Sequence, residues 1–337
     1  MLHSVINIDG GRRMTPQRPT MNDVARTAGV SLKTVSRVVN GETTVAPDLV
    51  ARVQAAVESL DYRPHVGATM LRRHDRSTRT IGVLLDDVSH PFSAALHRAV
   101  EDQARSRGIH VLTGSLDHDP VRERDLAAAF AERQTDGLIL APSGAELEPH
   151  TMPVVFVDRI PAGATGDTVV STNVSGAAGA VRHLIAHGHR QIGFLGGHRH
   201  LSTARDRYRG YQRALGRRAG PAVHDLHDPT EAEKAAIAML RGPGAPTALF
   251  AARSTVTFGA VRALRRLGRQ HAVALVGFGD FPLADLLDPP VTVVAQDPAR
   301  MGRTAAEALF ERIDGYDGAP REIRIPTTLI PRGSGEL

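Results

Sequence analysis

Residues 20–41 read TMNDVARTAGVSLKTVSRVVNG and contain the signals of two short helices separated by a tight turn. Thr20 is typical of a helix N-cap, because its side chain can accept a hydrogen bond from a free amide of the first turn, and a helix is predicted over Met21–Ala28. Gly29 supplies the turn, since glycine tolerates backbone angles that other residues avoid. A second helix is predicted over residues 32–40.

A third helix is predicted to begin near Pro47, because proline suits the first turn of a helix. Its apolar stripe consists of Val50, Val53, Val57 and Leu60. Two short helices joined by a glycine turn and followed by a third helix are typical of a helix-turn-helix unit.

The second of these helices has an apolar face and a polar face. The residues predicted to point to the core are Val35, Val38 and Val39. The residues predicted to point outward recur at helical spacing and are Lys33, Ser36, Arg37 and Asn40. Such side chains suit hydrogen bonding to base edges in the major groove of DNA. Spacing alone, however, favours the simpler interpretation of a solvated polar face.

The excess of positive charge lies at one end of the chain. Residues 1–79 carry 12 Lys and Arg against 7 Asp and Glu, a net charge of +5, which equals the net charge of the whole chain with its 41 basic and 36 acidic residues. The remaining residues are therefore neutral in sum. A basic segment joined to a neutral body indicates either a polyanionic partner or a solvated basic tail, and charge alone does not distinguish the two.

The exact order of residues decides between a polyanionic partner and a solvated basic tail. Residues 21–41 and 45–64 (VAPDLVARVQAAVESLDYRP) closely resemble the DNA-binding headpiece of the lac-repressor (LacI/GalR) family. The resemblance implies contacts to base edges in the major groove from Leu32, Lys33, Ser36, Arg37 and Asn40. It implies phosphate contacts from Thr20, Ser31, Thr34 and Tyr62. It also implies a hinge that becomes helical on DNA and places two residues in the minor groove, Ala68 and Leu71, although Leu71 can also be read as an ordinary buried leucine.

Beyond the headpiece, short apolar runs alternate with segments of helical length such as Phe92–Arg107 and Ala177–His187. The predicted strands are Ile81–Leu85, His110–Leu112, Gly137–Ala141, Val154–Val157, Gln191–Leu195, Ala248–Ala251, Ala272–Val276 and Val291–Val294. This alternation predicts an α/β body with parallel sheets, in which ligands bind at the carboxyl ends of the strands.

The body resembles the periplasmic-binding-protein-like domain of the same family, from IGVLLDDVSHPF (81–92) to PTTLIPRGS (326–334). The predicted fold is thus an all-α helix-turn-helix headpiece followed by an α/β two-lobed domain with parallel sheets and a ligand cleft between the lobes. The expected divisions are a disordered extension at 1–18, a headpiece at 19–64, a hinge at 65–79, and an effector-binding and dimerisation domain at 80–337. Its first lobe is expected at about 80–160 and 291–320, and its second at about 161–290 and 321–337, with crossings near 158–161, 288–291 and 318–321.

The resemblance carries a set of candidate effector-binding residues onto this chain, namely Asp87, His90, Phe92, Asp158, Asn173, Arg207, Arg253 and Asp280, with Arg159 beside them. Two departures from the family pattern concern charge, because Arg253 stands where an amide is usual and Gly279 where an aspartate is usual. If Arg253 faces the cleft, the expected effector is an anionic sugar derivative rather than a neutral sugar. The alternative is that Arg253 packs on the rim or bonds to Asp280.

Other classes of protein are disfavoured by the sequence. The chain contains no cysteine, and no segment has the length and apolarity of a membrane span or a secretory signal, so a cytoplasmic, nucleoid-associated location is expected. The histidines at 187, 189, 198 and 200 are expected to be structural, and neither a metal nor another cofactor is expected. No nucleophile, base and acid are arranged as in an enzyme.

The expected function is therefore that of a homodimeric transcriptional repressor. Its expected partners are pseudo-palindromic operator DNA and a sugar or sugar-derived effector. The alternative is a solute-binding protein without a DNA role.

Overall fold

The computed structural model describes residues 19–39, 42, 44–63, 77–144, 151–216 and 220–337. It divides into two units, residues 1–78 and 79–337, which are considered separately. The predicted extension at 1–18 and most of the predicted hinge at 65–79 lie outside the described residues.

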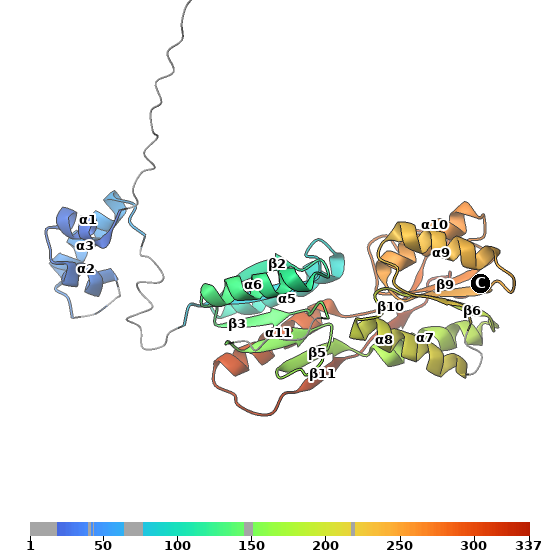
Figure 1. The fold of residues 1–337 in the computed structure, drawn as a ribbon. Helices are drawn as coiled ribbons and strands as arrows, with labels where there is room; N and C mark the ends of the chain where they lie inside the picture. Colours follow the sequence, from blue (N-terminus) through green and yellow to red (C-terminus); the bar gives the residue numbers. More distant parts are fainter. Residues whose placement is uncertain (1–18, 40–41, 43, 64–76, 145–150, 217–219) are drawn as a thin grey trace, which may run out of the picture. The chain divides into compact units, whose positions relative to one another are not determined.

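The first unit contains the three predicted helices, α1 (Met21–Ala28), α2 (Leu32–Val39) and α3 (Pro47–Ser59) (Figure 1). The predicted cap of α1 is confirmed, because Thr20 and Asp23 form a reciprocal capping box. Gly29 has the left-handed backbone angles, with φ of 61°, that end α1 and begin the turn. Ser31 caps α2 by accepting a hydrogen bond from the amide of Thr34 at 3.1 Å. The small core of this unit contains Val24, Val35, Val53, Ala56 and Tyr62.

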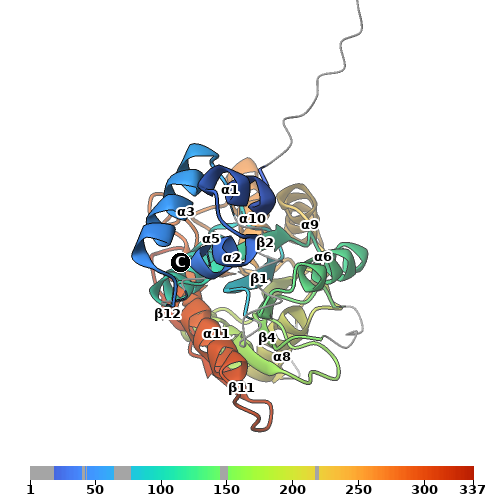
Figure 2. The same cartoon turned by 90° about the vertical axis from the view of Figure 1, so that its left-hand side faces the viewer.

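The second unit has two lobes, each a six-stranded sheet between helices (Figure 1). The sheet of lobe 1 has the order β11-β5-β4-β3-β1-β2 and all its pairs are parallel. Its strands are β1 (Thr80–Leu85), β2 (His110–Ser115), β3 (Gly137–Leu140), β4 (Val154–Val157), β5 (Asp167–Ser171) and β11 (Glu322–Ile325). Helices α5 (Pro91–Ser106) and α11 (Pro298–Ile313) cover one face, and α6 (Pro120–Glu132) covers the other (Figure 2).

The sheet of lobe 2 has the order β12-β10-β9-β8-β6-β7 and is parallel except for the antiparallel pair β10–β12. Its strands are β6 (Ile192–Leu195), β7 (Ala222–Val223), β8 (Ala248–Ala251), β9 (Ala274–Phe278), β10 (Thr292–Ala295) and β12 (Thr328–Ile330). Helices α7 (Asn173–Ala186) and α8 (Ser202–Leu215) cover one face. Helices α9 (Pro229–Arg241) and α10 (Ser254–Arg266) cover the other (Figure 1).

The predicted crossings between the lobes are wrong in position. The chain leaves lobe 1 after β5 at about residue 172, returns between β10 and α11 at 296–297, and leaves again between β11 and β12 at 326–327. The first and third crossings move because β5 and β11 pair with each other at the edge of the first sheet, which extends lobe 1 beyond the predicted limits. The second moves because β10 pairs with β9 and β12 and so belongs to lobe 2. Polar side chains join the crossings, since Gln296 donates to Ser171 at 2.8 Å and the hydroxyls of Thr172 and Thr327 lie 3.1 Å apart.

Among the described residues, no helix has both the length and the apolar character that a membrane span requires.

Candidate functional site

Helix α2 presents large side chains to solvent on one side. Leu32 is 47% exposed, which is unusual for a leucine in so small a unit, and Lys33 is also exposed. The side chain of Arg37 is 46% exposed and lies 3.4 Å from Glu42 in a weak surface ion pair. These three side chains are available to a partner of the first unit.

Two predicted DNA-contacting residues are placed differently. Ser36 was predicted to point outward, but it is only 8% exposed. Ser36 directly follows Val35, which is fully buried. Because α2 packs against both α1 and α3, its buried side is wider than one stripe of valines and includes Ser36. Tyr62 is 6% exposed and packs in the core, a role that the pattern did not indicate, and this burial raises the pKa of its hydroxyl.

The remaining predicted DNA contacts are partly beyond the described residues. Asn40, Ala68 and Leu71 lie outside them. Thr20 and Ser31 are exposed at the starts of α1 and α2, and Thr34 is half-buried. The hydroxyls of Ser31 and Thr34 lie 2.9 Å apart.

A cavity of about 210 Å³ lies between the two lobes. Four helices begin at its wall, because residues at the first turns of α5, α8, α10 and α11 line it. The N-terminal end of a helix carries partial positive charge and free amides, so this arrangement favours a ligand with negative charge or acceptor oxygens.

Arg207 on α8 is a buried cation of the cavity wall. Its Nε donates to Asn173 Oδ1 at 2.8 Å and its Nη1 to the carbonyl of Ala252 at 2.9 Å. Its guanidinium stacks on the ring of Phe278, 4.0 Å from the centroid. Burial lowers the pKa of Arg207 to about 10, although the group stays charged at neutral pH. A Cβ at Gly210 would lie 2.4 Å from the carbonyl of Val174, so this glycine allows α8 to approach α7 and brings Arg207 to Asn173.

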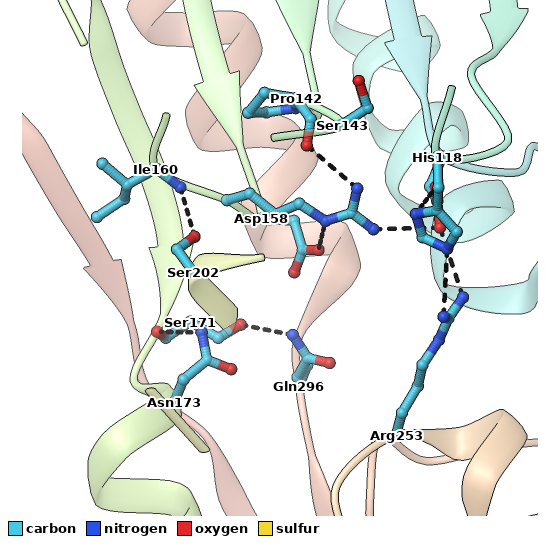
Figure 3. Close-up of polar contacts among 12 residues, drawn as sticks. His118, Pro142, Ser143, Asp158, Ile160, Ser171, Asn173, Ser202, Arg253 and Gln296 are labelled. Carbon is cyan, nitrogen blue, oxygen red and sulfur yellow. Dashed lines mark hydrogen bonds and ion pairs between the residues drawn. The ribbon is translucent and has the colours of Figure 1, made fainter. Parts of the chain in front are cut away.

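A network of charges from both lobes includes further residues of the cavity wall, among them Asp86, Arg159 and Arg253. The carboxylate of Asp86, at the end of β1, lies 3.1 Å from Arg159 Nη2 and 3.5 Å from Arg253 Nη2. His118 contacts both Asp86 and Arg253, and Arg253 points toward it in Figure 3. Arg159 also lies 3.6 Å from Asp158 and donates to the carbonyl of Pro142. The hydrogen bond from His118, together with Arg159 and Arg253, holds the pKa of Asp86 well below its usual range despite its burial.

Most predicted effector-binding residues line this cavity, namely His90, Phe92, Asp158, Arg207, Arg253 and Asp280. His90 Nε2 lies 3.0 Å from the hydroxyl of Ser254 in the other lobe, and burial together with Arg253 lowers the pKa of His90. Asp280 lines the cavity but is held by Arg332, at 2.7 and 2.8 Å, so the proposed bond between Arg253 and Asp280 is wrong.

Two predicted residues do not line the cavity. Asp87 is turned to its own loop, where its carboxylate accepts from the amide and hydroxyl of Ser89 at 2.8 and 2.7 Å, and Asp86 lines the cavity instead. Asn173 lies behind Arg207 and orients it.

The sequence analysis also missed His118, His198 and Gln296. His198 and Gln296 follow β6 and β10 in the sequence and line the cavity, so the rule that sites lie after strands could have indicated them.

The histidines that cluster in the sequence separate in space. His187 and His189 bond within lobe 2, to the carbonyl of His183 and to Thr247. His198 lies beside His118, His200 and His227. Among the described residues, no three potential ligands are arranged to hold a metal ion.

Comparison with known proteins gives two matches to family descriptions. Residues 20–65 match "Bacterial regulatory proteins, lacI family", and residues 181–335 match "Periplasmic binding protein-like domain". The HTH-type transcriptional repressor PurR of Photobacterium profundum is 30% identical, over 94% of this chain and 98% of its own length. The ribose operon repressor of Escherichia coli is also 30% identical, over 94% of this chain and 99% of its own length.

A solved structure of the lac repressor dimer, bound to operator and the anti-inducer ONPF, covers 95% of this chain and all of its own chain. It is 24% identical, with a TM-score of 0.81, and therefore shows the same fold. The two 30%-identical repressors extend the likeness over nearly the whole sequence, from the helix-turn-helix unit through both lobes. This chain belongs to the lacI family of bacterial regulatory proteins, which are not enzymes.

Proposed function

We propose that this chain is a homodimeric transcriptional repressor whose affinity for a pseudo-palindromic operator is controlled by a sugar-derived, anionic effector bound between its lobes. The observation that carries the DNA-binding half is the exposed side of α2, where Leu32, Lys33 and Arg37 are available to the major groove. A symmetric dimer would present two such helices to two half-sites. Phe258, Leu283 and Leu286 of lobe 2 are exposed and apolar, and are proposed to contribute to the contact between protomers.

The proposal for DNA binding predicts a large effect at one arginine of α2. Replacing Arg37 by Ala should weaken binding to an operator selected from random DNA by about 1–3 kcal/mol and relax base preference at one position in each half-site, because a bidentate contact to a base is lost. Binding to random-sequence DNA should change little. Fluorescence anisotropy with both DNAs measures the two effects.

The matched control for Arg37→Ala is Arg26→Ala, which removes the same charge from α1, where Arg26 is exposed and paired with Asp23. This variant should keep the base preference of the unaltered protein. Equal losses on operator and random DNA for Arg37→Ala would show that Arg37 contacts only phosphates.

The proposal for an anionic effector rests on the balance of charge in the cavity wall. Three arginines (Arg159, Arg207 and Arg253) line the cavity, whereas only two carboxylates (Asp86 and Asp158) are left to pair with them, since Asp280 is held by Arg332. The carboxylate of Asp86 pairs with both Arg159 and Arg253. The positive charge that has no carboxylate partner is therefore that of Arg207, whose hydrogen-bond partners among the described residues are neutral. An anion beside a buried guanidinium compensates the cost of burying that charge.

The size of the cavity limits the effector to a small molecule. Its volume of about 210 Å³ is below the roughly 300–1,000 Å³ of pockets for drug-sized ligands, so a single sugar ring with one charged substituent is preferred to a larger ligand. One relative is named a ribose operon repressor, which makes ribose a reasonable neutral reference.

The expected result is that ribose 5-phosphate or ribonate binds about 10- to 100-fold tighter than ribose, since a hydrogen-bonded contact to a charged group contributes roughly 1.5–3 kcal/mol. Titration calorimetry of the full chain measures the three affinities. Tight binding of ribose, with no gain for either anion, would contradict the proposed charge of the effector and leave the proposed DNA binding intact.

A further inference from the structure

The two lobes meet beside the cavity through two histidines that the effector proposal does not use, His118 and His198, and through Asp86 and Arg253. Asp86 and His118 belong to lobe 1, where they follow β1 and β2. His198 and Arg253 belong to lobe 2, where they follow β6 and β8. All contacts between these two pairs therefore run from one lobe to the other.

His118 joins a cation of lobe 2 to a carboxylate of lobe 1. Its Nε2 lies 3.2 Å from Arg253 Nη1 (Figure 3), and its Nδ1 lies 2.6 Å from Asp86 Oδ1. A guanidinium can only donate hydrogen bonds, so Nε2 must accept, and the single proton of the neutral ring is on Nδ1 beside the carboxylate. A doubly protonated ring would place N–H against N–H at Arg253 and would lose this bond.

A second contact between the lobes is made by imidazole rings. The centroids of His118 and His198 are 4.2 Å apart, with the rings tilted by 51°. His198 in turn lies 4.6 Å from His227 and 5.5 Å from His200. A Cβ at Gly144 of lobe 1 would lie 2.8 Å from the ring of His200, so the lobes are closely packed here as well.

The surroundings of His198 oppose positive charge on its ring. The charged and titratable groups that face the pair are Asp86, Arg159, His200, His227, Glu231 and Arg253. The carboxylate of Glu231 pairs with His227 at 2.9 Å, and the carboxylate of Asp86 also pairs with two arginines. Burial and the neighbouring His118 and Arg253 lower the pKa of His198 to about 4.

We propose that Asp86, His118, His198 and Arg253 form a clamp between the lobes that holds only while the imidazole of His198 is neutral, so that proton uptake there opens the cleft. Opening separates the two rings and returns His198 to water. The open form thus binds more protons than the closed form, and by linkage a fall in pH favours it. Closure is complete above the ordinary histidine pKa of about 6.5 and weakens as the pH falls from there toward the lower value of His198.

The clamp gives Arg253 a role other than binding the effector. In the closed form two of its nitrogens are used by His118 and Asp86, so it acts as a positioning residue that draws lobe 2 toward lobe 1. This inference concerns the effector-free protein and does not depend on the identity or charge of the effector.

The test is a distance measurement across the cleft in the full, effector-free chain. The natural chain has no cysteine, so Val121→Cys at the start of α6 and Ala238→Cys on α9 give one spin-labelling site in each lobe. Double electron–electron resonance should show a short distance between the two spin labels at about pH 8. At about pH 5.5 it should show a growing population at longer distance, because these two pH values span the histidine pKa.

The double variant His118→Gln, His198→Asn removes the titrating ring of His198 together with the ring that it packs against, and should lose the pH response. The matched control is His97→Gln, because His97 bonds to Thr113 within lobe 1, at 2.7 Å, and makes no link to lobe 2 in the described structure. This control should respond to pH as the unaltered protein does. A distance that does not change with pH in the unaltered protein would overturn the proposal, and so would a double variant that still titrates.

Discussion

Replacing Asp167 by Asn should destabilise the edge of lobe 1 by about 3 kcal/mol, since removing one partner of a buried ion pair leaves the other charges uncompensated. Asp167, the first residue of β5, is fully buried. Its carboxylate accepts from Arg312 at 2.7 and 3.1 Å, and from the side chain and amide of Arg321, each at 2.8 Å. It thereby joins β5, α11 and the start of β11. Both arginine side chains are partly exposed, at 15% and 33%, which places the expected loss at the lower end for such pairs.

The effect of Asp167 should depend on pH in a defined direction. The two arginines hold the pKa of Asp167 far below its ordinary value, despite burial, so the charged form is favoured by folding. Its contribution to stability is therefore present above the unfolded pKa of about 3.9 and is lost as the pH falls through the lower folded value. The difference between the natural chain and Asp167→Asn should be full at neutral pH and should shrink below about pH 4.

Amide hydrogen exchange of β5 and β11 measures this local stability without assuming that both lobes unfold together. The matched control is Glu311→Gln, because Glu311 is 54% exposed and pairs only with Arg321 among the described residues. Glu311→Gln should lower the local stability by about 0.2–1 kcal/mol, as for other surface ion pairs. Equal protection in Asp167→Asn and the natural chain would show that the buried carboxylate does not hold β11.

The pattern of apolar runs predicted most strands that are buried on both faces and part of the more exposed β2, and it missed β5, β7, β11 and β12. Strands such as β3 (GLIL) and β8 (ALFA) are continuous apolar runs and were predicted. Strand β11 (EIRI) carries two charged residues and is exposed at every second position, and β7 has only two residues, so neither stands out in the sequence. Strand β5 begins with the buried Asp167, which sequence reasoning treats as exposed. The missed β5 and β11 account for two of the misplaced crossings, and the assignment of β10 to the wrong lobe accounts for the third.

A residue of the candidate site could be predicted where one polar residue follows a strand. It could not be predicted where the backbone conformation of the turn decides which of two neighbouring side chains faces the cavity. Asp86 and Asp87 are adjacent, and only the turn after β1 decides which of them faces the cavity. His118 lies in a turn where it and Asp117 both have left-handed φ values, of 57° and 52°, and no sequence rule places such a residue against the other lobe. The partner of Arg253 depends on that placement.

Replacing Arg207 by Met should weaken binding of an anionic effector by about 10- to 100-fold, because a charged hydrogen-bonded contact contributes roughly 1.5–3 kcal/mol. Methionine keeps an unbranched, apolar side chain that can still pack on Phe278, so the loss is largely that of the guanidinium. Asn173 Oδ1 and the carbonyl of Ala252 lose their donor, and some loss of stability is expected in addition.

The preference of the protein for an anionic over a neutral ligand distinguishes the electrostatic role of Arg207 from its structural role. A variant that is merely less stable binds ribose and ribose 5-phosphate more weakly by the same factor, because mass action on the folded fraction does not depend on the ligand. Loss of the charge should instead lower the affinity ratio of phosphate to sugar. Arg207→Lys should retain part of the ratio, since it keeps the positive charge but lacks the planar fork. Calorimetry of the natural chain and both variants with the two ligands measures the ratio, and a ratio unchanged in Arg207→Met would show that Arg207 does not pair with the effector's charge.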